Sequence, residues 1–340
     1  MALFLLATYL TVINISGMTH QLTLHCKIRD REAGLSLINL LTQRFTYHDG
    51  KSWLREINSG LVLINGRKAD HGQTLTSGDQ LTYRAVNHRE PPVSTEIEVV
   101  FETPEFLLIG KPAGTPASRT GLIIQNTLVN ILRRHYQQDI HLLHRLDRET
   151  SGLVLCARDK TACRIHQKNL KRIMPGKYYL AVVRGVVKRS VIEIDQPLAV
   201  REGSPIRCRM WCVEHGQPSR TIFYKIGTTE NQSLLLAELI TGRKHQIRAH
   251  LAHIGHPLIG DKIYDHEGKF YLKREDGELT EEDYQTLGAH NHTLHAWAVR
   301  IQLEDCPSKF YFSRIFSTEM KRYLKNFPNW EEKAVKVLQP

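Results

Sequence analysis

The 340-residue sequence predicts an α+β protein with a small N-terminal domain and a larger domain built on a mixed, largely antiparallel sheet with flanking helices. The length suits two domains, and the apolar fraction of 41% is enough to form hydrophobic cores. In the C-terminal part, segments with strand character outnumber those with helical spacing and do not alternate regularly with them. A doubly wound parallel sheet needs that alternation, so a mixed or antiparallel sheet is predicted instead.

The first segment, residues 1–17, reads MALFLLATYLTVINISG. It is as apolar as a signal peptide or a membrane anchor, but it has no basic N-terminal region and is short for a membrane span. An ordinary soluble pattern starts at Met18. We therefore expect residues 1–17 to be a leader that is dispensable or not translated, and we expect no association with a membrane.

Residues 18–86 are predicted to form the small domain. LSLINLLTQRF (35–45) has the apolar spacing of a helix, and SWLREINSG (52–60) predicts a second helix. LVLING (61–66) predicts a strand that ends at an Asn-Gly turn, and SGDQLTYRA (77–85) predicts a turn followed by a strand. The expected order is thus two short helices followed by a hairpin.

Residues 87–96 are polar and contain two prolines, so they are predicted to be a linker. The larger domain is expected to span residues 97–330. Its strand-like segments are IEVVFE (97–102), FLLIGK (106–111), GLVLCAR (152–158), KYYLAVVRG (177–185), SRTIFYKI (219–226), SLLLAELITG (233–242) and LHAWAVRIQL (294–303). Its helix-like segments are NTLVNILRRHYQQ (126–138), TACRIHQKNLKR (161–172), KHQIRAHLAHI (244–254) and STEMKRYLKNF (317–327).

The charge of the chain favours an acidic partner. Lys and Arg number 46 against 35 Asp and Glu, a net charge of +11. Between Lys160 and Ile192 there is no acidic residue, although the stretch includes Lys168, Lys171 and Arg172. Nucleic acid is the commonest partner of such a surface, so phosphate contacts are predicted here. The alternative is an ordinary solvated face.

Six cysteines lie at positions 26, 156, 163, 208, 212 and 306, with no CxxC pair among them. Several of them sit in apolar runs. This pattern predicts reduced, buried thiols in a cytosolic protein rather than a framework of disulfides.

Three segments of the larger domain could carry chemistry. HRLDRETSGL (144–153) contains an acid between basic and apolar residues, GKYYLAVVRG (176–185) contains two tyrosines, and TGRKHQIRAHLAHIGHPLIGDKIYD (241–265) opens a helix, with Thr241 as its expected cap. In that helix Arg248 lies at the edge of the apolar stripe, where it could reach a buried carboxylate. An Asp that a cation keeps ionised in a dry pocket is a good nucleophile, and an aromatic ring stacks on a base. The residues alone leave these roles unassigned.

Together these segments resemble the RluA family of pseudouridine synthases, over about residues 97–327. The family pattern His-Arg-Leu-Asp, two variable positions and Thr-Ser-Gly matches residues 144–152, and GRKHQIRAHLAHIGHPLIGDKIY (242–264) is equally diagnostic. The related RsuA type carries Gly in place of His144 and Arg-Arg-Met in place of Arg-Ala-His. INSGLVLINGRKADHGQTLTSGD (57–79) resembles the S-four type of RNA-binding domain, in which the helix pair and the following turn contact RNA.

The resemblance implies roles for individual residues. Asp147 would be the catalytic aspartate, paired with Arg248, and Tyr179 would stack on the target base and assist a proton transfer. Strand geometry places Tyr178 on the other face. Lys111 and Pro112 match a motif with a mainly structural role. The substrate-binding positions implied by the motifs are His144, Arg145, Thr150 and Ile247, of which Arg145 would replace the extruded uridine in the RNA stack or bind the adjacent phosphate.

The function implied is isomerisation of specific uridines in RNA to pseudouridine. The S-four resemblance favours ribosomal RNA, and transfer RNA is the alternative. Because the isomerisation neither oxidises nor reduces the uridine and transfers no group from another molecule, no cofactor is expected. The protein is expected to be cytoplasmic and monomeric, with RNA as its partner.

Three other interpretations of these residues are open. The histidines at 245, 250, 253 and 256 have some of the spacings of a zinc site, but no HExxH or CxxC accompanies them, and Gly255 and Pro257 would break the helix around His256. An RNA-binding protein without catalysis would not need Asp147, Tyr179 and Arg248 together. The N-terminal segment could also be an unrelated small α+β module.

Overall fold

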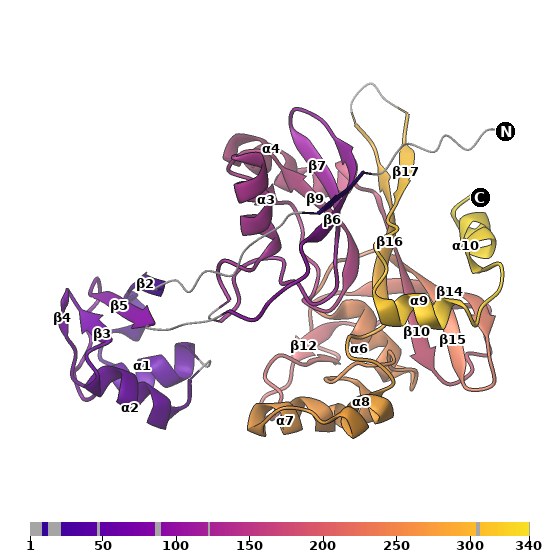
Figure 1. Ribbon diagram of the computed structural model, residues 1–340. Coiled ribbons are helices and arrows are strands. Elements are labelled where there is room, and N and C mark those ends of the chain that lie inside the picture. The colour runs from indigo at the N-terminus through magenta and orange to yellow at the C-terminus, as the bar shows by residue number, and fades with distance from the viewer. Residues whose placement is uncertain are drawn as a thin grey trace. The chain divides into compact units, whose positions relative to one another are not determined.

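A computed structural model describes residues 9–12, 22–45, 48–85, 90–121, 123–303 and 307–339 (Figure 1). The chain divides into two compact units. The small unit comprises Asn14–Pro92 and Ser118–Thr127, and the large unit comprises Met1–Ile13, Val93–Ala117 and Leu128–Pro340. Each unit is described by itself.

The small unit has two helices and a four-stranded sheet in the order β2-β5-β3-β4. The helices α1 (Leu37–Arg44) and α2 (Gly50–Asn58) confirm the helical spacing of the sequence, and α2 begins where Asp49 accepts a hydrogen bond from the Ser52 backbone. Trp53 is fully buried at the centre of the core. The strands are β2 (Leu22–Lys27), β3 (Val62–Ile64), β4 (Arg67–Lys68) and β5 (Gln80–Ala85).

Residues 118–127 belong to the small unit, although the sequence placed them in the larger domain. The Glu90 carboxylate accepts hydrogen bonds from the backbone N–H groups of Ile124, Gln125 and Asn126. Ile124 also packs against the core of the small unit. Contacts between distant parts of the sequence leave no local pattern, so the return of residues 118–127 to the small unit was not predictable.

The large unit is built on a mixed sheet in the order β1-β6-β7-β9-β16-β10-β15-β14-β11, with β17 beside β16 and β8 beside β9. Among the described strands of this sheet, β9 and β16 form a parallel pair and the other pairings are antiparallel, as the sequence predicted. The strands are β1 (Tyr9–Val12), β6 (Glu96–Glu102), β7 (Phe106–Lys111), β8 (His141–Leu142), β9 (Ser151–Ala157), β10 (Gly176–Arg184), β11 (Val191–Asp195), β14 (Arg220–Thr228), β15 (Gln232–Leu239), β16 (Leu294–Ile301) and β17 (Lys309–Phe312).

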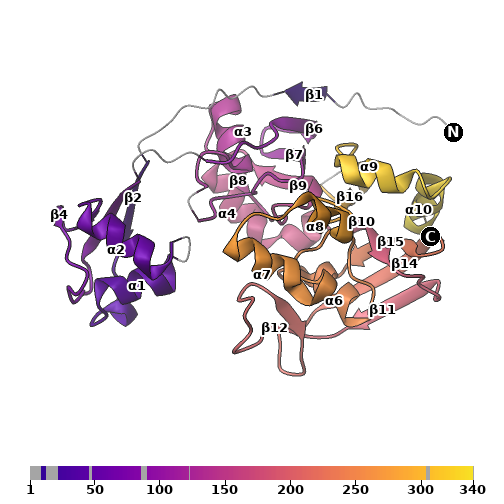
Figure 2. The ribbon, with the colours of Figure 1, turned by 60° about the horizontal axis from the view of Figure 1, so that its bottom comes forward.

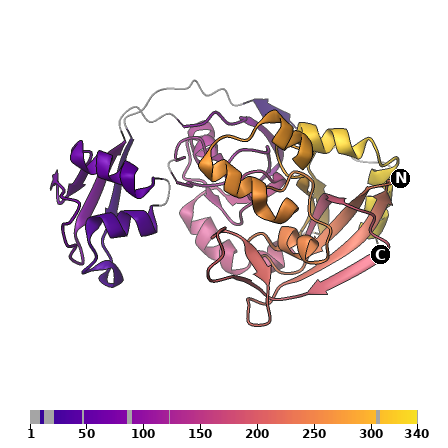
Figure 3. The same cartoon turned by 90° about the horizontal axis from the view of Figure 1, so that it is seen from below.

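Helices cover both faces of this sheet. On one face Tyr178, Leu180 and Val182 of β10 pack with residues of α9 (Thr318–Leu324) and α10 (Trp330–Leu338). Since side chains alternate along a strand, Tyr179 points to the opposite face. The helices α6 (Gln246–His253), α7 (Lys269–Asp276) and α8 (Glu281–Leu287) lie together on the underside of the large unit (Figure 3).

Further helices are α3 (Leu128–Tyr136), α4 (Lys160–Lys168) and α5 (Leu170–Ile173). Elements that the sequence did not reveal include α7, α8, α10, β11 and a short hairpin of β12 (Leu198–Val200) and β13 (Met210–Cys212). The unit also continues past residue 330, because α10 buries Ala334 and Leu338. No described helix has the length and apolar character needed to cross a bilayer.

Some expectations fall on residues outside the described ranges. Of the expected leader, residues 9–12 are described as β1, which pairs with β6, and the rest lie outside. The expected linker, residues 87–96, is described from residue 90 onward. Cys306 also lies outside, while the other five cysteines are free thiols.

Candidate active site

Asp147 lies in the turn between β8 and β9, which is packed against the body of the large unit. Leu143 and Leu146 are buried, so apolar side chains anchor the turn. Lys111, at the end of β7, is fully buried and supports the turn from its buried side. Its Nζ donates hydrogen bonds of 2.8, 2.8 and 3.0 Å to the backbone oxygens of Pro112, Thr115 and Arg148. Three carbonyls match the three donors of an ammonium group.

The end of the turn is fixed by β16. The Thr150 hydroxyl lies 2.7 Å from Nε2 of His292. Gly152 has φ +109°, and a Cβ atom there would lie 2.2 Å from the backbone oxygen of Ala296. Only glycine therefore allows β9 to run this close to β16. The Thr-Ser-Gly part of the motif serves to dock the turn on the sheet.

Arg248 joins two carboxylates. Its Nη1 donates to Oδ2 of Asp147 at 2.6 Å, while Nε and Nη2 donate to the two oxygens of Asp261 at 2.7 and 2.8 Å. Arg248 is 5% exposed and Asp261 is fully buried. Oδ1 of Asp261 also accepts hydrogen bonds from the backbone of Ile263 and Tyr264. Asp261 therefore fixes the Nε and Nη2 side of the guanidinium in the interior. Asp147 binds Nη1 at the more exposed side, where the Asp147 side chain is 30% exposed.

Asp147 is held in its ionised form. Burial alone would raise the pKa of its carboxyl, but the charge of Arg248, aided by neighbouring histidines, lowers the pKa to about 2. An ionised carboxylate at the mouth of a largely buried site can act as a nucleophile toward an electrophilic carbon. The pairing that the sequence predicted between Asp147 and Arg248 is present.

His245 is a further neighbour of Asp147. Its Nε2 lies 3.7 Å from Oδ2 of Asp147, and its Nδ1 lies 3.2 Å from the Tyr264 hydroxyl. The residue has φ +55° and precedes the first residue of α6, so the helix begins at Gln246. Thr241 is not its cap, because its hydroxyl donates instead to the Gln246 side chain. Burial and the charge of Arg248 lower the pKa of His245 to about 3, so its ring is neutral at pH 7.

Tyr179 faces the same site from β10. It is 7% exposed, and burial followed by the charge of Asp147 raises the pKa of its hydroxyl. The hydroxyl is thus protonated at neutral pH and available as a donor. Tyr178 points to the other face, where its hydroxyl donates to Glu238 at 3.2 Å. Ile247 is buried in α6 next to Arg248.

His144 and Arg145 differ in their surroundings. Nε2 of His144 accepts a hydrogen bond of 3.0 Å from the Leu155 backbone, and burial lowers the pKa of its ring to about 3. His144 therefore braces the turn against β9. Arg145 is exposed beside it, so solvent and a ligand can reach its side chain.

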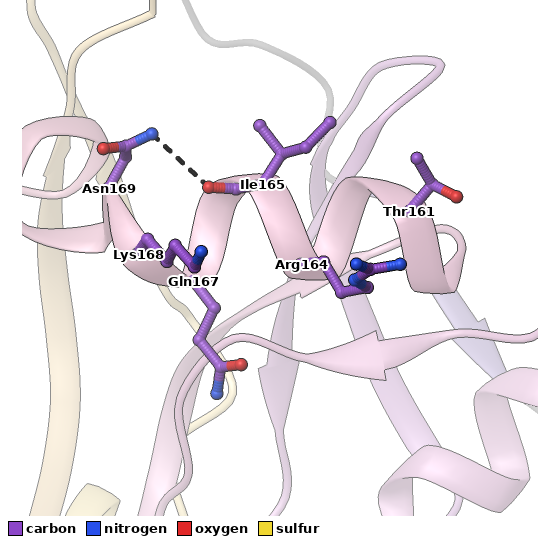
Figure 4. A pocket seen from close by; sticks show the side chains of 6 residues that line it. All are labelled: Thr161, Arg164, Ile165, Gln167, Lys168 and Asn169. Carbon is purple, nitrogen blue, oxygen red and sulfur yellow. Dashed lines mark hydrogen bonds between the residues drawn. The ribbon is translucent and has the colours of Figure 1, made fainter.

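The basic residues expected to contact phosphate lie on another part of the unit. Lys168 ends α4, while Lys171 and Arg172 belong to α5, and all three are exposed. A shallow hollow on α4 is lined by Thr161, Arg164, Ile165, Gln167, Lys168 and Asn169 (Figure 4). None of the residues that interact with Asp147 lines this hollow.

The histidines once weighed as zinc ligands have separate partners. The His250 ring bonds the Thr221 hydroxyl and the Gln196 carbonyl, and Nδ1 of His256 bonds the Arg184 carbonyl. Among the described residues, no three His, Cys, Asp or Glu side chains converge as a group that could hold a metal ion.

The sequence did not single out Asp261, the place of His245 beside Asp147 or that of Lys111 beneath the turn. One signal was available for Asp261. A buried guanidinium has more donors than a single carboxylate can satisfy, so Arg248 required a second acceptor. Asp261 lies in the same quoted motif, after a short apolar run.

Comparison with known proteins shows the family to which the chain belongs. A family model described as RNA pseudouridylate synthase matches residues 105–253. An uncharacterized RNA pseudouridine synthase of Aquifex aeolicus is 30% identical over 231 residues, which cover 63% of this chain and 72% of that protein. The mitochondrial tRNA pseudouridine(32) synthase of Saccharomyces cerevisiae is 31% identical over 246 residues, or 71% of this chain. The chain spans only 52% of that yeast protein.

A solved structure shares the fold of the large unit. Human RNA Pseudouridylate Synthase Domain Containing 4 superimposes with a TM-score of 0.51 at 22% sequence identity, covering 67% of this chain and 92% of that one. The mixed sheet and its flanking helices are therefore those of pseudouridylate synthase domains.

Proposed function

The chain belongs to the family of RNA pseudouridylate synthases, and we propose on this premise that it isomerises uridines of structured RNA to pseudouridine. The observation that carries the proposal is the carboxylate of Asp147, which Arg248 at 2.6 Å keeps ionised and which the buried ring of Tyr179 faces. Ile247 is buried in the helix that carries Arg248. This arrangement offers one nucleophile, one aromatic platform and one apolar contact to a flat base.

The proposed reaction breaks the bond between N1 of uracil and C1′ of ribose and forms a bond between C5 and C1′. C5 loses its proton and N1 gains one, so the product has the same mass as the substrate. Asp147 supplies negative charge next to C1′ while the base is detached, and the Tyr179 ring holds the base. The Tyr179 hydroxyl assists the proton transfer.

The target uridine has to leave the base stack, which costs a few kcal/mol. We assign the compensating contacts to Arg145, to phosphate contacts of Lys168, Lys171 and Arg172, and to the small unit. The small unit acts here as an S-four-type RNA-binding domain. Its helix pair followed by strands supports this role, as do exposed cations on α2 and β4, namely Lys51, Arg55, Arg67 and Lys68.

Ribosomal RNA is the substrate class that we favour, because of the S-four-type unit, by analogy. Transfer RNA is the second candidate, favoured by the name of the yeast relative. The five described cysteines are free thiols, which suits the reducing cytosol, and we propose that the protein acts there. The monomeric state stays a prediction.

The decisive experiment is the change Asp147→Asn. The amide is nearly isosteric, and Arg248 keeps both hydrogen bonds to Asp261, so the variant should fold with little loss of stability. It should form no pseudouridine, while RNA binding stays within about tenfold, or roughly 1.4 kcal/mol. The assay adds purified protein to total RNA from cells that lack it and maps pseudouridine by carbodiimide modification and reverse transcription.

Asp195→Asn is the matched control, because Asp195 is exposed on β11 at the end of the sheet. It should be as active as the parent protein. Turnover by folded Asp147→Asn near that of the parent would remove Asp147 from the chemistry and refute the proposed mechanism.

A further inference from the structure

The hairpin of β12 and β13, with its loop 201–209, has no role in the function proposed so far. It stands out from the sheet below α6 (Figure 2). Leu198 and Ile206 are buried in a small core that they share with Tyr264 and with Ala249 of α6. The hairpin is therefore docked firmly on the helix that carries Arg248.

A series of cation–π contacts runs from the hairpin to the active site. The guanidinium carbons of Arg201 and Arg209 lie 4.2 and 4.1 Å from the centre of the Trp211 ring. Two planar groups cannot both lie this close on one face of a ring without overlapping, so the two arginines flank Trp211 on opposite faces. The guanidinium of Arg209 also lies 5.4 Å from the Tyr264 ring, and that of Arg248 lies 5.1 Å from it.

The hairpin is also tied to Tyr264 by hydrogen bonds. The backbone N–H of Met210 donates to the Tyr264 hydroxyl at 2.9 Å, and the same hydroxyl lies 3.2 Å from Nδ1 of His245. The guanidinium carbon of Arg209 can be no farther from that of Arg248 than 5.4 Å plus 5.1 Å. The loop of the hairpin therefore comes close, at Arg209, to the guanidinium that pairs with Asp147.

The charges of the hairpin lack acidic partners. Arg201 and Arg207 are exposed, and among the described residues no carboxylate forms an ion pair with either of them or with Arg209. Arg209 instead donates Nη1 to the backbone oxygen of Glu267 at 2.9 Å. Two guanidinium groups held on one ring repel each other, and an anion would relieve that repulsion.

We infer that the β12–β13 hairpin binds the RNA strand next to the target uridine, with Arg201 and Arg207 on its phosphates. Trp211 holds Arg201 flat, so that its guanidinium edge presents N–H groups in the fork that phosphate oxygens match. The outer face of such a stacked guanidinium is also a surface on which an unpaired base can stack. This inference rests on the proposed function, because it places the strand by reference to Asp147.

The test compares two double variants of the full chain. Arg201→Gln with Arg207→Gln removes two exposed charges from the hairpin. Lys321→Gln with Lys333→Gln removes two exposed charges from α9 and α10, which cover the opposite face of the sheet. Binding of a short fluorescein-labelled oligouridylate is followed by anisotropy over a series of KCl concentrations, with thermal melting recorded for each protein.

The hairpin variant should show a log–log salt slope that is smaller by about 1.4, since each phosphate contact to a single strand contributes about 0.7. The control variant should keep the slope of the parent. An unchanged slope in the folded hairpin variant, or an equal fall in both variants, overturns the inference. So does equally tight binding of labelled oligoglutamate with the same loss of slope, because the hairpin would then be a general anion surface for acidic proteins.

The test of the hairpin and the test of pseudouridine formation can fail independently. If the parent protein forms no pseudouridine in any RNA, the synthase proposal fails, yet the slopes still decide whether the hairpin binds RNA. If the parent is active and the hairpin variant matches it in both slope and turnover, the hairpin inference alone fails.

Discussion

Asp261 accepts two hydrogen bonds from Arg248 on the side of the guanidinium away from Asp147. The change Asp261→Asn therefore tests how far the reaction depends on the position of Arg248. Asparagine keeps Oδ1 as the acceptor for the backbone of Ile263 and Tyr264. Its amide group, however, would face Nε–H of Arg248, where Oδ2 now accepts at 2.7 Å. Two donors then oppose each other, and the guanidinium must turn.

The expected loss of stability follows from the contacts. Removing one partner of a buried ion pair costs about 3–5 kcal/mol, and the lower end applies because Arg248 keeps Asp147. A loss of about 3 kcal/mol lowers the melting temperature of a domain of this size class by roughly 6–12 °C. Turnover should fall by about 100-fold, the effect of displacing a reacting group by about 1 Å.

The pH dependence distinguishes displacement from protonation. Loss of the negative charge of Asp261 favours the ionised form of Asp147, whose pKa is already held at about 2. The carboxylate therefore stays ionised in the variant, and the defect in turnover should be the same from mildly acidic to mildly alkaline pH. A defect that disappears as the pH rises would show instead that Asp261→Asn raises the pKa of Asp147.

The assay is pseudouridine formation per folded molecule, at a temperature where both proteins are folded. Asp283→Asn is the control, because Asp283 also pairs with a cation, Lys273 at 2.7 Å, and caps α8. It should lose stability without losing turnover. Parental turnover in folded Asp261→Asn would refute the idea that Asp261 positions Arg248 for the reaction.

Two further predictions concern the tyrosines and the basic helices. Tyr179→Phe keeps the ring but removes the hydroxyl, so turnover should drop while RNA binding is retained. Tyr178→Phe should lose only its hydrogen bond to Glu238 and stay active. Equal losses of turnover in a kinetic assay would contradict the placement of the two side chains on opposite faces of β10. Changing Lys168, Lys171 and Arg172 together to Ala should lower the log–log salt slope of RNA binding by up to about 2, because each phosphate contact to a single strand contributes about 0.7. An unchanged slope would show that the three side chains are solvated and do not contact RNA.

Local patterns predicted the parts of the fold that depend on local spacing. The alternation in β10 and the apolar stripe of α6 were both visible, and the position of Arg248 at the edge of that stripe followed from helix geometry. The motif around Asp147 located the turn, whereas its pairing with Arg248 was implied by the family resemblance. In each of these cases the pattern lies within one element.

What the sequence did not reveal depends on contacts between distant segments. Residues 118–127 join the small unit through Glu90, and Lys111 supports the turn through carbonyl groups that any residue could supply. The strands of the β12–β13 hairpin are too short for a periodic pattern, and its stack on Trp211 joins two arginines of the loop to one residue of β13. Backbone acceptors and cation–π contacts of this kind leave no trace in hydrophobic spacing.

The parallel pairing of β9 with β16 has a consequence for biosynthesis. Ser151 and His295 form one of the bonds that dock the turn carrying Asp147, and they are 144 positions apart in the chain. Contacts of such sequence separation form late, because a long loop must close before they can. We expect the turn that carries Asp147 to remain unorganised on the ribosome until β16 has emerged from the exit tunnel. On the function proposed above, a partly synthesised chain would bind RNA through the small unit before it could modify it.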